Sequence, residues 1–128
     1  MSSRLRGVVI AAAYLAIAVW WLWPLPLRLA DHSTYPDGGL AEVPADYHLI
    51  TWALAWDTHA LTTHPGALFD ANIFYPVRHA LAFSEHFLGY LPLFAPTYLL
   101  SGNPVLASNL LLLATYPLCA LAMYALAR

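Results

Sequence analysis

The stretch that decides the fold is residues 105–127, VLASNLLLLATYPLCALAMYALA, which has 23 residues and no charged side chain. A helix needs about 20 consecutive apolar residues to cross the hydrocarbon core of a bilayer. Pro117 falls inside the run, and membrane helices tolerate proline because neighbouring groups satisfy the freed backbone. The sequence therefore predicts a transmembrane helix here.

A second uncharged run lies near the N-terminus, at residues 7–27, GVVIAAAYLAIAVWWLWPLPL. Its length suffices for a span, and three tryptophans gather at its far end, where aromatic rings favour the membrane interface. A signal peptide cleaved after Ala30 is the alternative. The run is long for the hydrophobic region of a signal peptide, and Arg28 stands where the protease prefers a small residue. We therefore expect an uncleaved membrane anchor.

The overall composition also indicates a membrane protein. The chain of 128 residues is 61% hydrophobic and only 9% charged, whereas soluble domains are about 25% charged. It contains no lysine and no basic stretch, and its formal net charge is −2. Nucleic acid is therefore not an expected partner. The single cysteine, Cys119, cannot form a disulfide within the chain.

The segment between the two long runs is less regular. Residues 87–100 are apolar, but a helix of that length reaches only about 21 Å, against a core of roughly 30 Å. Extending the run back to residue 81 brings Glu85 and His86 to the membrane rim. We expect a short second transmembrane helix at residues 81–100, joined to the last helix by a tight turn at 101–104.

Charge gives the expected orientation. Arg4 and Arg6 precede the first span, and residues 30–80 hold six acidic residues against one basic residue (Asp31, Asp37, Glu42, Asp46, Asp57 and Asp70 against Arg78). The positive-inside rule places the N-terminus in the cytoplasm and this loop outside. The 101–104 turn is then cytoplasmic. The expected fold class is all-α membrane, with three transmembrane helices and a long extracytoplasmic loop, as part of a longer chain.

The loop contains one helical pattern, at residues 45–63. Acidic and apolar residues recur there at helical spacing, which indicates an amphipathic helix, as at Asp46, Ile50, Ala53 and Asp57. Trp52 and Trp56 suit a helix that lies on the membrane surface. Asp46 and Asp57 share a face but lie about 16 Å apart along the axis, so they cannot bind the same ion. Asp46 could also be only a first-turn acid that stabilises the helix dipole.

Other polar residues of the loop are candidates for binding. Asp70 and Asn72 would point from an aromatic segment into a polar pocket, or would bond their own backbone in a turn. Arg78 could meet a phosphate group, or could be an interfacial arginine. The pair Glu85 and His86 would be costly at the edge of a span unless it faced a polar cavity, which favours a functional role. The six histidines do not show the spacing of a zinc site.

Four phrases occur in a suggestive order: Ala45-Asp46-Tyr47-His48-Leu49, Ser84-Glu85-His86-Phe87-Leu88, Ser101-Gly102-Asn103-Pro104 and Ala125-Leu126-Ala127-Arg128. Together with FDANIFYP at residues 69–76, they resemble the N-terminal part of the GT-C superfamily of membrane glycosyltransferases, and especially its uncharacterised bacterial polytopic members. The resemblance covers nearly the whole chain. The chain departs from the family where Tyr47 replaces a common second acid and Glu85-His86 replaces a Pro-Pro pair.

The resemblance implies a location in the bacterial inner membrane and transfer of sugar from a polyprenyl phosphate to an extracytoplasmic acceptor. The implied partners are the bilayer, the polyprenyl-phosphate sugar donor and the remaining transmembrane helices of a full-length chain. Asp46 would act as general base or hold a divalent metal ion with His86, and Glu85 would be a second catalytic residue. Substrate contacts would come from Asp57, Asp70, Asn72 and Arg78.

Two further expectations complete this interpretation. Residues 1–128 alone should be inactive, because later helices would supply part of the site. The alternative function is that of a non-catalytic polytopic membrane protein, a transporter or an assembly subunit. A transporter would more often carry polar residues in the middle of its spans, and the runs at 7–27 and 105–127 hold few of them.

Overall fold

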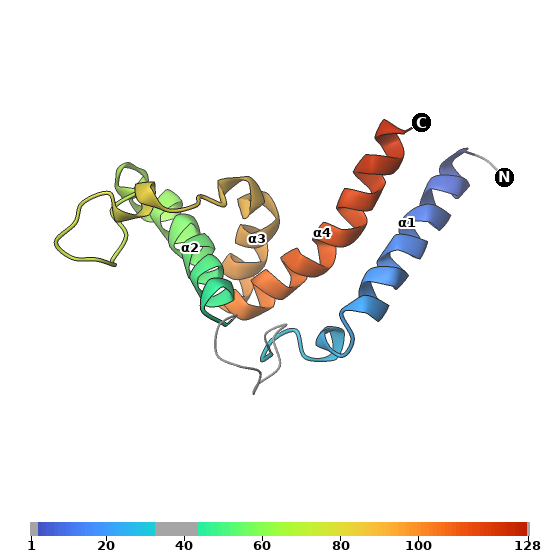
Figure 1. The fold of residues 1–128 in the computed structure, drawn as a ribbon, viewed down its shortest axis with the longest axis horizontal. Helices are drawn as coiled ribbons and strands as arrows, with labels where there is room; N and C mark the ends of the chain where they lie inside the picture. Colours follow the sequence, from blue (N-terminus) through green and yellow to red (C-terminus); the bar gives the residue numbers. More distant parts are fainter. Residues whose placement is uncertain (1–2, 33–43, 128) are drawn as a thin grey trace.

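The computed structural model describes residues 3–32 and 44–127, and within these ranges every regular element is a helix (Figure 1). The expected all-helical fold is confirmed. The α-helices are α1 (Ser3–Trp21), α2 (Pro44–Thr63), α3 (Leu91–Ser101) and α4 (Pro104–Leu126). Short 3-10 helices lie between them, at η1 (Leu25–Leu27), η2 (Pro65–Ala67), η3 (Ala80–Phe83) and η4 (Leu88–Tyr90).

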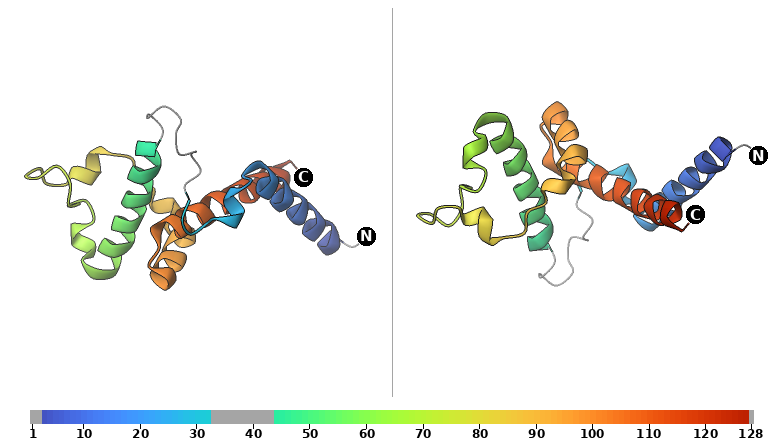
Figure 2. Two further views of the ribbon diagram at one scale, coloured as in Figure 1. Left: turned by 90° about the horizontal axis from the view of Figure 1, so that it is seen from below. Right: turned by 90° about the horizontal axis from the view of Figure 1, so that it is seen from above.

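Helices α1 and α4 lie side by side and run in opposite directions, so that both ends of the chain lie at the same end of the pair (Figures 1 and 2). The start of α4 is fixed by Asn103, whose side-chain oxygen accepts the Leu106 N–H at 3.0 Å, and by Pro104 in the first turn. Helix α1 ends at Trp21, because Pro24 and Pro26 cannot continue a regular helix.

The outer surface of this pair is apolar. The exposed fraction is 65% for Val8 and 57% for Ile17 on α1, and 64% for Met123 on α4. By length and composition, α4 is the one helix in the described ranges that could cross a bilayer, and Leu5–Trp21 is a shorter apolar helix beside it. An exposed apolar surface of this extent is unusual for a protein surrounded by water.

The main buried core lies where α2 and α3 pack against the first half of α4. Phe94 is completely buried in its centre. The same cluster contains Leu54 from α2, Leu91 from α3, and Ala107 and Leu111 from α4. A smaller core joins α2 to the loop that follows it, through Ala53, Ala71 and Leu81.

The second transmembrane helix predicted at residues 81–100 is wrong in its extent. The α-helix there, α3, has only 11 residues and begins at Leu91, next to Pro92. Residues 80–90 instead form η3 and η4 with an irregular segment between them. At 1.5 Å per residue, α3 measures about 16 Å, roughly half the thickness of the hydrocarbon core.

The 101–104 turn, expected on the opposite side of the membrane from the loop at residues 30–80, lies beside residue 30. The side-chain amide nitrogen of Asn103, Nδ2, donates to the Ala30 carbonyl at 2.9 Å. The 101–104 turn therefore lies near the C-terminal end of α1, close to residue 30. Helices α2 and α3 lie between α1 and α4 in the chain and pack against the first half of α4 (Figure 1).

A buried polar cluster ties α2 and the segment after α1 to α4. Its centre is Asn109, which is completely buried. The Asn109 oxygen accepts the Tyr47 hydroxyl at 2.9 Å, and its amide donates to the carbonyls of Leu29 at 2.8 Å and His32 at 2.6 Å. Next to it, the hydroxyls of Thr51 and Ser108 are 2.9 Å apart. These bonds hold the start of α2 against α4.

Candidate functional site

The helix predicted at residues 45–63 is confirmed as α2, Pro44–Thr63. Asp57 lies on the face of α2 that carries Ala53, Leu54 and Ala60, and all three are buried. That face is covered by the chain that returns after η2, so the Asp57 carboxyl is completely buried as well, with 0% of the residue exposed. A buried acid of this kind is rare unless it is paired or serves a function.

The side chain that faces Asp57 is His86. Its Nδ1 lies 3.9 Å from Oδ2 of Asp57, too far for a hydrogen bond but close enough for an ion pair when the imidazole is protonated. The Phe69 ring meets the imidazole edge to face, with 4.8 Å between the ring centroids. The site thus brings together residues from α2, from the turn after η2 and from the segment before η4.

Four buried polar atoms at this site have no hydrogen-bond partner: both carboxylate oxygens of Asp57 and both ring nitrogens of His86. Buried polar groups in folded proteins are nearly always satisfied, so a cluster of four unsatisfied atoms needs an explanation. Burial raises the pKa of the Asp57 carboxyl above its ordinary value of 3.8, and the nearby His86 opposes part of that rise. A carboxylate with a raised pKa is a better proton acceptor near neutral pH.

The raised pKa of Asp57 predicts a pH dependence of stability. The folded protein holds the proton more tightly than the unfolded chain, so stability falls as the pH rises above about 3.8 toward the folded pKa. The slope contributed by this group is at most about 1.4 kcal/mol per pH unit. Asp57→Asn should remove that part of the slope, measured by unfolding in detergent micelles at several pH values. An unchanged slope in the variant would mean that the pKa of Asp57 is not raised.

The two residues predicted to be catalytic lie apart from this buried pair. Asp46 is in the first turn of α2 and is exposed, and Glu85 is exposed beside His86. In the described part of the chain, no hydrogen bond or ion pair joins Asp46 to Glu85 or to His86. No group of three metal-ligating side chains occurs there either. The acid that the structure does bring to His86 is Asp57.

Asp70 bonds a backbone N–H, as in the turn alternative, but that N–H lies nine residues away and not in its own turn. Its Oδ1 accepts the backbone N–H of His79 at 2.7 Å and lies 3.3 Å from the imidazole Nδ1 of the same residue. Asp70 therefore closes the base of the loop between residues 70 and 79. Asn72 and Arg78 are exposed on that loop.

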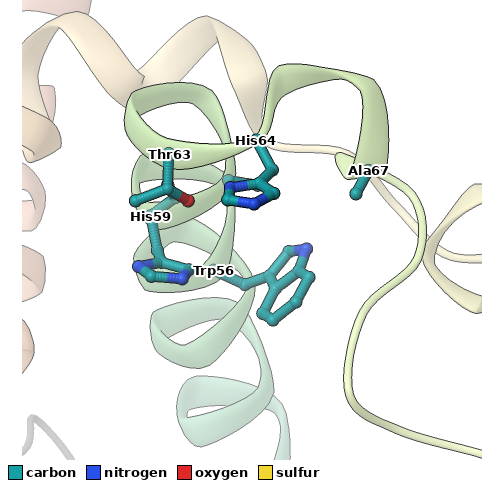
Figure 3. Close-up of a pocket in the computed structure, with 6 residues that line it drawn as sticks. Trp56, His59, Thr63, His64 and Ala67 are labelled. Carbon is teal, nitrogen blue, oxygen red and sulfur yellow. The ribbon is translucent and has the colours of Figure 1, made fainter.

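A pocket of about 380 Å³ opens at the C-terminal end of α2 (Figure 3). The Trp56 indole forms one wall and is held in place by its N–H, which donates to the Leu68 carbonyl at 2.9 Å. The imidazoles of His59 and His64 lie beside it in Figure 3. The lining of this pocket is almost entirely apolar, so it can hold an apolar surface of a ligand, such as one face of a sugar ring.

Sequence reasoning found the residues of the buried pair but not their pairing. The signal for burial was present, because Asp57 follows Ala53 and Leu54 by four and three residues on one helical face. Nothing local indicated that His86, 29 positions later, would return to that face. Phe69, which covers the imidazole, was noted only as part of the phrase at residues 69–76, and Asn109, which anchors α2, only as one of the few polar residues of the last span.

Comparison with family models, with curated proteins and with solved structures finds no match to this chain. The relationship to GT-C glycosyltransferases therefore stays a prediction from the sequence. The geometry of the buried Asp57–His86 pair and the arrangement of α1 and α4 carry the functional argument.

Proposed function

We propose that the chain is the N-terminal part of a membrane glycosyltransferase that uses a polyprenyl-phosphate sugar on the extracytoplasmic side. The observation that carries this proposal is the Asp57–His86 pair, a buried carboxylate and a partly buried imidazole whose four buried polar atoms have no hydrogen-bond partner. The resemblance of the sequence to the GT-C superfamily suggests the reaction class, and the burial of Asp57 beside His86 supports Asp57, in place of Asp46, as the residue that accepts the proton.

The arrangement of the two long helices supports a membrane location for this site. If α1 and α4 both cross the bilayer, the segment between them, with α2 and α3, lies on one side. Arg4 and Arg6 at the start of the chain and Arg128 after α4 then share the other side. The positive-inside rule makes that side the cytoplasm. The buried pair is then extracytoplasmic, where a lipid phosphate at the membrane surface is within reach.

In the proposed reaction, Asp57 accepts the proton of an acceptor hydroxyl as its oxygen attacks the anomeric carbon. A new glycosidic bond forms, the bond from that carbon to the phosphate oxygen breaks, and the polyprenyl phosphate leaves with the bonding electrons. A protonated His86 imidazole, 3.9 Å from the carboxyl, favours the ionised form of Asp57 before the attack. The proton taken from the acceptor hydroxyl then stays on Asp57 until the product leaves. Phe69 covers the imidazole, so the substrate reaches the pair only when this ring moves aside.

The pocket beside Trp56 is the proposed position of the acceptor sugar. Trp56 directly precedes Asp57, and Ala60, one turn further along α2, also lines the pocket. Pocket and carboxyl therefore lie within about one helical turn of each other along the axis. The apolar lining, with the Trp56 indole as one wall, would contact one face of the sugar ring.

A non-catalytic role, as a transporter or an assembly subunit, is the competing function. Polar side chains on α4 would be expected to line a transport path, and the buried ones already have partners in the fold. Asn109 makes three hydrogen bonds, and Ser108 is bonded to Thr51. Because their hydrogen bonds are satisfied, these residues fit an anchoring role. Among the described residues, the Asp57–His86 pair holds four buried polar atoms without a partner, against one at His32.

The direct test measures transfer in membranes that contain the protein at the full length its gene encodes. Radiolabelled sugar should move from a polyprenyl-phosphate donor to an acceptor in these membranes, and an Asp57→Asn variant present at the same level should not support it. Transfer that is equal with and without the protein would exclude the proposal.

The proposed topology makes a separate prediction about the 101–104 turn. In a Cys119→Ala background, Ser101→Cys should react with an impermeant thiol reagent added from outside, because Ser101 is exposed at the turn that contacts Ala30. Gly38→Cys, in the loop after α1, is the matched control and should react from the same side. If only Gly38→Cys were labelled from outside, the 101–104 turn would be cytoplasmic, as the arrangement with three spans predicts.

A further inference from the structure

We propose that the loop at residues 72–83 is a membrane-docking element, which inserts aromatic side chains into the lipid headgroup region and places Arg78 against lipid phosphates. This inference rests on the membrane location proposed above and is independent of sugar transfer. In Figure 1 the loop extends from the free end of α2, at the opposite end of the molecule from α1, and Figure 2 shows the same separation.

The side chains of this loop are exposed to an extent that a water-facing loop would not favour. The exposed fraction is 97% for Tyr75, 85% for Phe83 and 73% for Phe74, and Val77 is also more than half exposed. Large apolar side chains grouped in this way mark a surface that contacts another apolar phase. Aromatic rings in particular prefer the interface between water and lipid.

The shape of the loop is fixed by its own bonds, so the rings are held outward and not left to collapse on the protein. Asp70 binds the His79 N–H at its base, and the Leu81 N–H donates to the Phe69 carbonyl at 3.2 Å. Ala71 and Leu81 are buried against Ala53 of α2. Because the base is anchored to a rigid helix, inserting the tip costs little conformational entropy.

The charge of residues 72–83 favours lipid as the partner of this loop. Residues 72–83 contain Arg78 and His79 and no acidic residue, whereas the rest of the segment from 30 to 71 is acidic. An arginine beside aromatic rings can hold a phosphate oxygen while its stem lies along the apolar boundary. Anionic lipids also attract such a basic element by about 1 kcal/mol for each charge near the surface. The membrane interface offers both an apolar layer for the aromatic rings and phosphate groups for Arg78.

The test measures the depth of the loop in vesicles of phosphatidylcholine and phosphatidylglycerol. A spin label on Tyr75→Cys, in the Cys119→Ala background, is compared with one on Leu118→Cys, an exposed position of α4. Collisions with oxygen, which concentrates in lipid, and with a water-soluble nickel complex give the depth. Both labels should favour oxygen over nickel, with the Tyr75 label closer to the surface. Adding Arg78→Gln should move the Tyr75 label toward water, and Arg78→Lys should not.

Each other outcome contradicts a different part of the proposal. A Tyr75 label that favours nickel while the Leu118 label favours oxygen would place the loop in water and overturn the inference alone. A Tyr75 label that meets neither collider would show the loop covered by protein, which also overturns it. A Leu118 label that favours nickel would instead remove the membrane location on which this inference rests. Equal depth in the Arg78→Gln and Arg78→Lys variants would exclude the phosphate contact.

Discussion

Asp57→Asn should lower the rate of sugar transfer by about 10²-fold or more in the full-length protein, the usual scale for the loss of a general base. The folded protein should remain as stable as the wild type or become more stable. Asn has the same shape but carries no charge, so it avoids the cost of a buried carboxylate. Activity and stability should thus change in opposite directions, which a purely structural role of Asp57 would not produce. Transfer assays and unfolding in micelles measure the two effects.

The controls for this prediction are the two exposed acids, Asp46 and Glu85. Asp46→Asn and Glu85→Gln should each reduce transfer much less than Asp57→Asn, because both side chains face solvent and contact neither Asp57 nor His86 through a hydrogen bond or an ion pair. His86→Asn should shift the acid side of the pH–rate profile, since His86 sets the protonation of Asp57. A larger loss in Asp46→Asn would assign the base to the first turn of α2 and contradict the site proposed here.

The elements that local chemistry defines were predictable from the sequence. The start of α4 follows from Asn103 and Pro104, an N-cap followed by a proline in the first turn, and its length follows from the uncharged run. The bounds of α2 follow from the amphipathic pattern and from His64 and Pro65, which end it. Both helices agree with the predicted ranges to within one residue at each end.

What the sequence did not predict depends on contacts between distant segments. Hydrophobicity alone made residues 81–100 resemble a span, but it does not distinguish a membrane helix from a short helix packed on its neighbours. Phe94 and Leu91 are apolar because they fill the core against α2 and α4, not because they face lipid. Likewise, a turn signal at 101–104 gives a reversal of direction without saying at which end of α1 it lies.

In the candidate site, too, local features were predictable and contacts between distant segments were not. The burial of Asp57 could be inferred from its place on the apolar face of α2, whereas its partner is brought in by the fold of residues 64–87. Asp46 attracted attention because it opens a helix and matches a family pattern, yet it is exposed in the structure. Position along the chain indicated which acids to consider, and only packing distinguished the solvated acid from the buried one.

Asn109→Leu should lower the free energy of unfolding by about 3 kcal/mol or more. Leucine has nearly the same volume but makes no hydrogen bond, so the Tyr47 hydroxyl and the carbonyls of Leu29 and His32 all lose a partner. The two backbone carbonyls lose the donor that Asn109 supplies, at a cost of about 1–3 kcal/mol for each. Because these bonds hold α2 and the segment after α1 against α4, the variant should also expose Tyr47 to solvent. Unfolding in micelles, followed by circular dichroism, measures the stability.

Asn72→Leu is the matched control, because Asn72 is exposed and the same change there should alter stability by no more than about 0.5 kcal/mol. Asn109→Asp separates the two kinds of bond: it keeps an acceptor for Tyr47 and loses both donations to the backbone carbonyls, and it adds a charge that burial opposes. It should therefore destabilise the protein at least as much as leucine at neutral pH and less at low pH, where the carboxyl is protonated. Equal stability of the Asn109→Leu and Asn72→Leu variants would show that the polar cluster does not anchor the outer segment to α4.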